Sequence, residues 1–511
     1  MQNNDKKVLL RISNLKQYFP LKGGRFVKAN DGITLDIYEG ETFGLVGESG
    51  CGKSTLGRTI LQLYHQTYGR TMYYGRSLDD LAPKYVIDTV KNLKARRTKL
   101  RELEQKRDKL EADYAKLSEK EQYAKHGELD AARKLAEDAL LDITKIVGGF
   151  LVVDDLDPVI AAYSKDYAIA RKLSSMEEKR QELQVDVDDA EYAKKTAEEA
   201  GKSGKDDQLQ KAQEKLKQCD DQIAALRAQL DAGRKEIEAL RAPYANDPEF
   251  QKYDAYRDDG IDLARLEYNE MRRLRRDMQL IFQDPYSSLN PRMSVGQIIS
   301  EGMQAHNMIK KKDARMQEMV LKIMDDCGLA PYFLHRFPHQ FSGGQRQRIG
   351  IARALATRPK FVVCDEAVSA LDVSIQAQII NLLLDLKEQQ NLTYMFITHD
   401  LSVVKYISDR VGVMYLGTMV ELAAADEIFH HPIHPYTEAL LNAIPTTDTV
   451  GAKELSILEG DIPSPVNPPK GCKFHTRCKY CTEICTQVVP EWEEVRPNHF
   501  VACHHKLEGK E

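Results

Sequence analysis

The 511-residue chain is 30% charged, and its Lys+Arg 73 and Asp+Glu 78 leave a formal net charge of -5. This balance gives no overall basic excess, so nucleic acid is not expected as a partner. The first residues lack the apolar core of a secretory signal, and no run of about 18 apolar residues predicts a membrane span. We therefore expect a cytoplasmic protein of several domains, which must dock on other subunits if it serves a membrane process.

The first predicted elements are strands in residues 8–46, where apolar and polar side chains alternate and the last five residues form an apolar run. A glycine-rich loop and a helical apolar pattern follow at once. Strand, loop and helix in this order predict a phosphate-binding loop, in which Lys53 neutralises phosphate charge and the Ser54 hydroxyl binds Mg²⁺. Its predicted nucleotide-binding residues are Gly47, Glu48, Ser49, Gly50, Cys51, Gly52, Lys53, Ser54 and Thr55.

A long helical segment comes next, from about residue 79, where the composition shifts to Lys, Glu, Ala, Leu, Arg and Gln. Apolar residues recur every seven positions at Leu209, Leu216, Ile223, Leu230 and Ile237. Five heptads predict a coiled-coil helix of about 50 Å, and a weaker apolar set in residues 100–117 is a candidate for the opposing helix. Both ends must return to one body, so an antiparallel hairpin or small bundle is expected. The apolar residues 150–153 are either an exposed contact at its tip or its small core.

Buried parallel strands are predicted again beyond residue 274, at 361–365 and 393–397. Asp365 closes the first of them and is a natural Mg²⁺ ligand, and the next carboxylate, Glu366, can polarise an attacking water. Before this strand, a serine and two glycines open a helix and form a second anion site at a helix N-terminus. The residues of that site are Ser342, Gly343, Gly344 and Gln345.

The order of these motifs resembles the ATP-binding cassette (ABC) family, in which residues 341–345 are the signature motif. The resemblance implies that Gln283 is the Q-loop residue, that Asp372 belongs to the D-loop and that His399 is the switch histidine. The implied catalytic residues are Glu366, His399 and Gln283, and the implied Mg²⁺ ligands are Ser54, Gln283 and Asp365. Tyr18 resembles the aromatic residue that stacks on adenine, although it and the adjacent Phe19 can also simply pack in the core.

Residues 283–293, 372–378 and 434–437 are similar to the ATPase subunits of oligopeptide, dipeptide and nickel importers. The implied fold is an α/β P-loop nucleotide-binding domain, with a RecA-like core and a helical subdomain, in residues 1–78 and 263–430. An antiparallel helical coiled coil is inserted at 79–262 and has no counterpart in the family pattern. A small C-terminal extension with a cysteine cluster is expected at 431–511. The insertion is either a solvated spacer or a docking arm for another protein.

The function implied by this resemblance is ATP hydrolysis that powers import through ATP-driven closure of a dimer. The expected partners are two membrane permease subunits, a second ABC ATPase that is identical or homologous, and indirectly an extracytoplasmic solute-binding protein. The expected location is peripheral, at the cytoplasmic face of the cell membrane. The alternative is a coiled-coil ABC ATPase acting on DNA or chromosomes, but there the coil enters after the Q-loop, whereas here the helical segment precedes Gln283.

Five of the nine cysteines lie in the last forty residues, which in a reducing cytoplasm indicates metal before disulfide. Within the family such a tail resembles an iron–sulfur site, and thiolates suit that role. The implied ligands of a [4Fe-4S] cluster are Cys472, Cys478, Cys485 and Cys503. Zn²⁺ stays the alternative, because four thiolates also suit zinc and histidines lie nearby, and unligated thiols are the third possibility.

Overall fold

The structure is a computed structural model that describes residues 6–201, 206–310, 315–443 and 460–507, without the side chains of 119–121, 123, 124 and 126. Its contacts divide the chain into two compact units. The first consists of Met1–Gly75 with Met271–Glu511, and the second of Arg76–Glu270. The four-part division proposed from the sequence stays a prediction.

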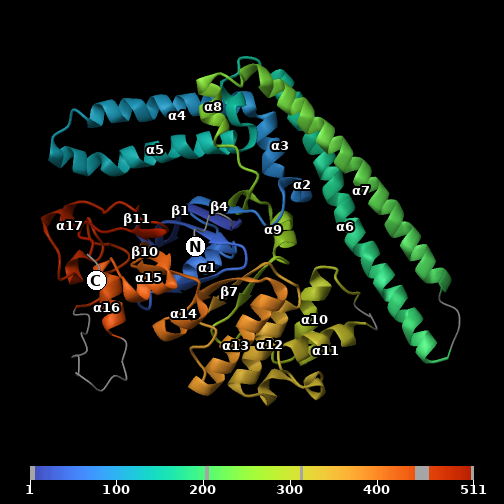
Figure 1. The fold of residues 1–511 in the computed structure, drawn as a ribbon. Helices are drawn as coiled ribbons and strands as arrows, with labels where there is room; N and C mark the ends of the chain where they lie inside the picture. Colours follow the sequence, from blue (N-terminus) through green and yellow to red (C-terminus); the bar gives the residue numbers. More distant parts are fainter. Residues whose placement is uncertain (1–5, 202–205, 311–314, 444–459, 508–511) are drawn as a thin grey trace. The chain divides into compact units, whose positions relative to one another are not determined.

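Two β-sheets form the frame of the first unit (Figure 1). Antiparallel strands of the smaller sheet pair in the order β2-β1-β4. They are β1 (Val8–Pro20), β2 (Phe26–Tyr38) and β4 (Tyr68–Tyr73). The larger sheet has the order β11-β12-β10-β9-β3-β8-β7-β6. Its strands are β3 (Thr42–Val46), β6 (Met278–Ile281), β7 (Phe361–Asp365), β8 (Thr393–Ile397), β9 (Arg410–Tyr415), β10 (Thr418–Ala424), β11 (Glu493–Arg496) and β12 (His499–Val501).

The parallel part of the larger sheet positions the candidate site. Strands β9, β3, β8, β7 and β6 run parallel, and Leu45 and Asp365 each pair with Ile397. Carboxyl ends of parallel strands lie at one edge of a sheet, where ligands of open α/β sheets bind. The segments that follow β3, β6, β7 and β8 therefore meet at one edge, although their residues lie as far apart as 47 and 399 in the sequence.

Helices surround the two sheets of the first unit (Figure 1). They are α1 (Lys53–Ile60), α10 (Val295–Ala305), α11 (Met316–Asp326), α12 (Gly343–Leu355), α13 (Val373–Gln390), α14 (Leu401–Ile407), α15 (Ala425–His430), α16 (Pro435–Asn442) and α17 (Glu483–Gln487). A large apolar core joins α10 to α13 with β7 and β8 and includes the fully buried Ile299, Ile349 and Phe396.

The C-terminal segment continues the large sheet rather than standing apart. Strand β12 pairs with β10, and the fully buried carboxylate of Glu421 accepts hydrogen bonds from the backbone N–H groups of Ile433 and His434. The contacts place this segment within the first unit and do not separate it as a domain of its own.

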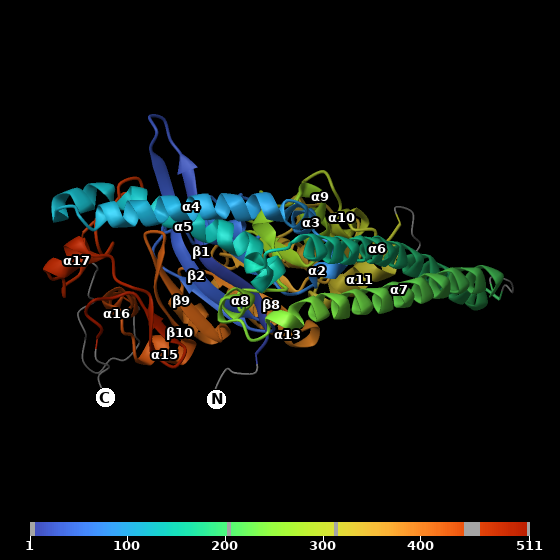
Figure 2. The same ribbon diagram turned by 90° about the horizontal axis from the view of Figure 1, so that it is seen from above.

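The second unit consists mainly of long helices, and Figures 1 and 2 both show α6 beside α7 and α4 beside α5. Its elements are α2 (Leu78–Leu81), α3 (Lys84–Lys91), α4 (Leu93–Tyr114), α5 (Glu119–Val147), α6 (Asp157–Glu199), α7 (Asp206–Arg241), α8 (Pro248–Asp254) and β5 (Ile261–Asp262). Helix α9 (Tyr268–Leu274) spans the boundary between the units.

The heptad residues of α7 face α6. Ile223 and Leu230 pack with Leu173 of α6, and Cys219 of the second heptad set belongs to the same apolar cluster. The prediction that residues 100–117 supply the opposing helix is wrong, because α4 packs along α5 instead. Helices that follow one another in the chain commonly pack as neighbours, and α6 directly precedes α7.

A separate apolar cluster decides the role of residues 150–153. Phe150, Leu151 and Val153 are buried, and the Phe150 ring contacts that of Phe250 edge-on at 5.6 Å between centroids. The guanidinium of Arg241 lies 4.7 Å from the centre of the Phe150 ring. These apolar residues are therefore the core of the second unit and not an exposed tip.

Across both units, the described residues contain no helix of the length and apolar character that a membrane crossing requires.

Candidate functional site

The glycine-rich loop lies between β3 and α1 as predicted from the sequence. Gly52 is the N-cap residue of α1 with φ +102°, and a Cβ there would collide with the carbonyl oxygen of Ala29. Only glycine fits this position. The buried Lys53 ammonium donates to the carbonyl oxygens of Gly47 at 2.7 Å and Glu48 at 3.0 Å. The loop thus presents a cation and the amides of a helix N-terminus, a combination suited to phosphate.

A hydroxyl and a carboxylate meet beside this loop. Ser54 donates from Oγ to Oδ1 of Asp365 at 2.5 Å, and Arg58 lies 3.2 Å from the other carboxylate oxygen. Asp365 is 1% exposed, at the end of β7. Hydroxyl and carboxylate oxygens are hard ligands, so this donor set fits Mg²⁺.

Glu366 lies between two further predicted residues. The side-chain amide of Gln283 donates to Oε2 of Glu366 at 2.6 Å, and Nδ1 of His399 lies 3.6 Å from Oε1. Glu366 has φ +48°, which is uncommon for a residue with a side chain and is typical of strained functional positions. The three predicted catalytic side chains are thus close together at the edge of the sheet.

The signature residues form a separate site on α12. Ser342 is the N-cap residue, and its hydroxyl accepts from the N–H of Gln345 at 3.4 Å, while the Gln345 side chain accepts from the N–H of Ser342 at 3.1 Å. Gly343 and Gly344 occupy the first turn. Asp372, the N-cap residue of α13, makes no side-chain capping bond. The hydrogen bonds of these serine and glutamine side chains are local and do not reach the glycine-rich loop.

Tyr18 has a polar partner and an aromatic neighbour. Its hydroxyl donates to Asp31 at 2.5 Å, and its ring meets that of Tyr68 edge-on. Burial and Asp31 raise the pKa of Tyr18. Burial alone would raise the pKa of Asp31, but Lys473 and the Tyr18 hydroxyl lower it below its usual range. The adjacent Phe19 packs edge-on against Tyr64.

The C-terminal segment contacts the glycine-rich loop, which no sequence pattern indicated. Arg477 forms two hydrogen bonds with the Glu48 carboxylate, and the Tyr436 hydroxyl accepts from the backbone N–H of Glu48 at 2.9 Å. Lys473 forms an ion pair with Asp31 at 3.1 Å. These contacts join residues about 400 positions apart, and no local pattern predicts them.

The four tail cysteines are neighbours but form no ligand set. Burial, together with the other three thiols, raises the pKa of Cys503 to about 12, and burial raises that of Cys472 to about 11. The N–H of Cys472 donates to the carbonyl of Cys485. Among the described residues, which include all of these cysteines, no three His, Cys, Asp or Glu side chains are arranged to hold a metal ion.

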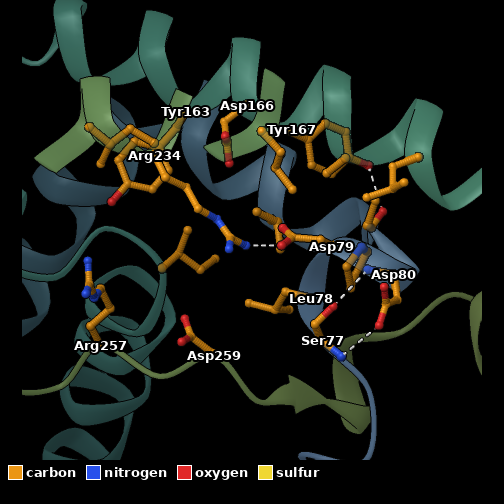
Figure 3. A pocket seen from close by; sticks show the side chains of 18 of the residues that line it. Ser77, Leu78, Asp79, Asp80, Tyr163, Asp166, Tyr167, Arg234, Arg257 and Asp259 are labelled. Carbon is orange, nitrogen blue, oxygen red and sulfur yellow. Dashed lines mark hydrogen bonds and ion pairs between the residues drawn. The ribbon is translucent and has the colours of Figure 1, made fainter. Parts of the chain in front are cut away.

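A cavity of about 710 Å³ lies within the second unit, between α2, α6 and α7 (Figure 3). Asp79 of its wall pairs with Arg234, whereas Oδ1 of Asp166 is buried without a hydrogen bond. Burial, followed by the charge of Asp79, raises the pKa of Asp166 to about 6. The ionised carboxylate is therefore less stable at this position than in water.

We expect Asp166→Asn to stabilise the second unit at pH 7.5. The pKa of Asp166 is raised on folding, so its stabilising contribution is present below about pH 4 and is lost as pH rises through about 6. With allowance for partial exposure, the gain is about 1 kcal/mol at pH 7.5 and shrinks at pH 5. Hydrogen exchange along α6 in the full chain measures it, with the exposed Asp231→Asn on the same cavity wall as control. Equal protection in the variant and the wild type at pH 7.5 would contradict the prediction.

Comparisons with known proteins agree with this arrangement. The family model described as ABC transporter matches residues 30–254 and 251–369, and that described as oligopeptide/dipeptide transporter, C-terminal region, matches residues 420–485. The oligopeptide transport ATP-binding protein AppF of Bacillus subtilis is 52% identical over 250 residues, which are 48% of this chain and 75% of AppF.

The match to a second relative reaches along nearly the whole chain. YkfD of Bacillus subtilis, whose name also describes oligopeptide transport and ATP binding, is 34% identical over 498 residues, 97% of this chain and 95% of YkfD. That the inserted segment at 79–262 has no counterpart in the family pattern stays a prediction.

Proposed function

This chain belongs to the ABC transporter family as an ATP-binding subunit of the oligopeptide-importer group, and on that premise we propose that its ATP hydrolysis powers the import of oligopeptides or dipeptides. Nickel and related solutes are served by similar subunits and stay within the proposal. The observation that carries it is the convergence of Gln283 and His399 on Glu366, next to the Ser54 and Asp365 pair.

The proposed roles follow from the chemistry of each group. Lys53 and the loop amides hold the β- and γ-phosphates, and Ser54, Asp365 and Gln283 hold Mg²⁺ directly or through water. When bound, Mg²⁺ neutralises charge on the phosphates. Glu366 accepts a proton from the attacking water, and His399 and Gln283 orient that water and the γ-phosphate. Tyr18 stacks on adenine.

The signature site completes the reaction from a second subunit. One chain carries one glycine-rich loop and one signature helix, and the N-terminus of α12 at Ser342 is a helix end that can bind an anion. We propose that Ser342, Gly343, Gly344 and Gln345 bind the ATP held by a partner ATPase, identical or homologous, near the Asp372 loops of both. Closure of this dimer drives two membrane permease subunits at the cytoplasmic face of the membrane, and a solute-binding protein delivers the substrate on the other side.

The alternative of a coiled-coil ATPase acting on DNA is not favoured, since both relatives described above carry oligopeptide transport names. We propose two alternative roles for the second unit, a coiled-coil spacer or a docking arm for another protein. The pairing of α6 with α7 through heptad residues supports the coiled coil.

Transport by the assembled complex tests the proposed function. Vesicles that contain this chain with its permease subunits and a partner ATPase are expected to accumulate a labelled oligopeptide only when ATP is supplied. Vesicles with Glu366→Gln are expected to accumulate none. ATP-independent uptake, or equal uptake by the variant, would exclude the proposed coupling.

We also propose that the tail thiols bind a [4Fe-4S] cluster, with Zn²⁺ as the alternative. Their spacing and their mutual proximity support this proposal, whereas their arrangement in the structure does not. The protein purified without oxygen is expected to contain about four iron atoms per chain and to lose them on Cys478→Ser. Stoichiometric zinc without iron, or no metal at all, would reject the cluster. The exposed Cys481→Ser is the matched control.

A further inference from the structure

The C-terminal segment holds the carboxylate of Glu48, the second residue of the glycine-rich loop. Two nitrogens of Arg477 lie 2.7 and 3.0 Å from the two oxygens of Glu48. The Arg477 side chain is 4% exposed and that of Glu48 23%. A bidentate ion pair of this kind is geometrically specific, and it fixes both partners far better than a single exposed contact.

A second residue of the same segment holds the main chain of Glu48. The Tyr436 hydroxyl accepts from the Glu48 N–H, and the Tyr436 ring is fully buried against Tyr415 and Phe474. The guanidinium of Arg477 lies 6.0 Å from the centre of the Tyr415 ring. The main chain of Glu48 is thus held by Tyr436 of a packed aromatic cluster, and its side chain by Arg477, which lies beside that cluster.

A parallel set of contacts reaches the other end of the loop. Lys473 donates to Asp31 and to the carbonyl of Leu416. The neighbour of Asp31, Asn30, is buried and donates from its side chain to the carbonyl of Gly52 at 3.1 Å. The segment around residues 473–477 therefore contacts the first half of the loop directly and the second half through β2.

We propose that Arg477, with Tyr436, is a positioning residue for ATP binding, so that the C-terminal segment sets the affinity of the glycine-rich loop for phosphate. The inference rests on the proposed binding of ATP by this loop and extends it. A loop that is already fixed loses less conformational freedom when ATP binds. Arg477 also neutralises the Glu48 carboxylate, which when unpaired repels phosphate at this short range.

ATP affinity of Arg477 variants tests the inference in the full chain. Arg477→Gln is expected to raise the dissociation constant and the KM for ATP about tenfold, with kcat at saturating ATP within about twofold of wild type. Arg477→Lys keeps the charge but loses the bidentate geometry, so an increase of about threefold is expected. Arg496→Gln removes an exposed ion pair on the same segment, with Glu427, and is expected to change neither constant.

The Glu48→Gln background distinguishes positioning from general damage. If Arg477 acts through Glu48, then Arg477→Gln has little further effect in that background. An unchanged affinity in Arg477→Gln, or the same loss in both backgrounds, overturns the inference. If Arg477→Gln does not fold, as judged by thermal unfolding, the same cycle is run with Arg477→Lys.

The same measurements distinguish failure of the proposed ATPase function from failure of the positioning inference. Suppose that the wild-type chain binds ATP, that this affinity falls in Arg477→Gln, and that ATP is never hydrolysed. The positioning inference would then hold, and the proposed ATPase activity would be rejected. Normal hydrolysis with no dependence on Arg477 rejects only the inference.

Discussion

Glu366→Gln is expected to reduce ATP hydrolysis by about 10² to 10⁴-fold and to leave ATP binding within about twofold of wild type. The amide has nearly the same shape as the carboxylate, and its oxygen can still accept a hydrogen bond from Gln283. In the wild type, Nε2 of Gln283 lies 2.6 Å from Oε2 of Glu366. It cannot take a proton from water. The loss therefore falls on kcat, because the missing interaction is made only in the transition state.

Release of phosphate by the full chain with its partner ATPase measures kcat, and a fluorescent ATP analogue measures binding. Glu388→Gln removes an exposed carboxylate from α13 and is the matched control, with no expected change in either quantity. Hydrolysis by Glu366→Gln at the wild-type rate would remove Glu366 from the role of general base. Loss of binding and hydrolysis together would indicate that Glu366 shapes the loop instead.

Much of the candidate site could be predicted from the sequence, because its groups lie at the ends of strands with strong local signals. The loop of residues 47–55 follows an apolar strand, and Asp365 closes another. These two strands run parallel in one sheet with only β8 between them, so their carboxyl ends lie at the same edge. That is why Ser54 and Asp365, 311 positions apart, are in contact.

The support of the loop could not be predicted in this way. Arg477 and Glu48 are 429 positions apart, and a single arginine between cysteines has no periodicity or capping pattern to mark its partner. The buried aromatic cluster that carries Tyr436 is likewise a product of tertiary packing. Contacts of this kind depend on which elements the fold brings together, and short sequence patterns do not encode that choice.

The pairing of helices α6 and α7 also could not be predicted from a local sequence pattern. The heptad pattern identified the buried face of α7, including Ile223 and Leu230, but it did not identify the helix that covers this face. Helix α6 has a less regular apolar stripe, so its partnership with α7 was not apparent. A heptad specifies that a helix needs a partner and leaves the partner open.

Lys53→Ala is expected to weaken ATP binding by about 100-fold or more. Lys53 is 5% exposed, and its ammonium is the charged group that the loop directs toward phosphate. Removal of one partner from a buried charged pair costs about 2–5 kcal/mol, and each 1.4 kcal/mol is a factor of ten in affinity.

Equilibrium binding of a fluorescent ATP analogue measures the effect, and Lys22→Ala, an exposed lysine outside the loop, is the control. Lys53 also donates to the carbonyls of Gly47 and Glu48, so thermal unfolding must show that the variant is folded. In a folded variant the loss of binding is expected to exceed the tenfold loss expected for Arg477→Gln, because in our proposal Lys53 binds phosphate directly and Arg477 acts only through Glu48. Wild-type affinity in folded Lys53→Ala would mean that phosphate is bound elsewhere, and the roles assigned to Ser54 and Asp365 would fall with it.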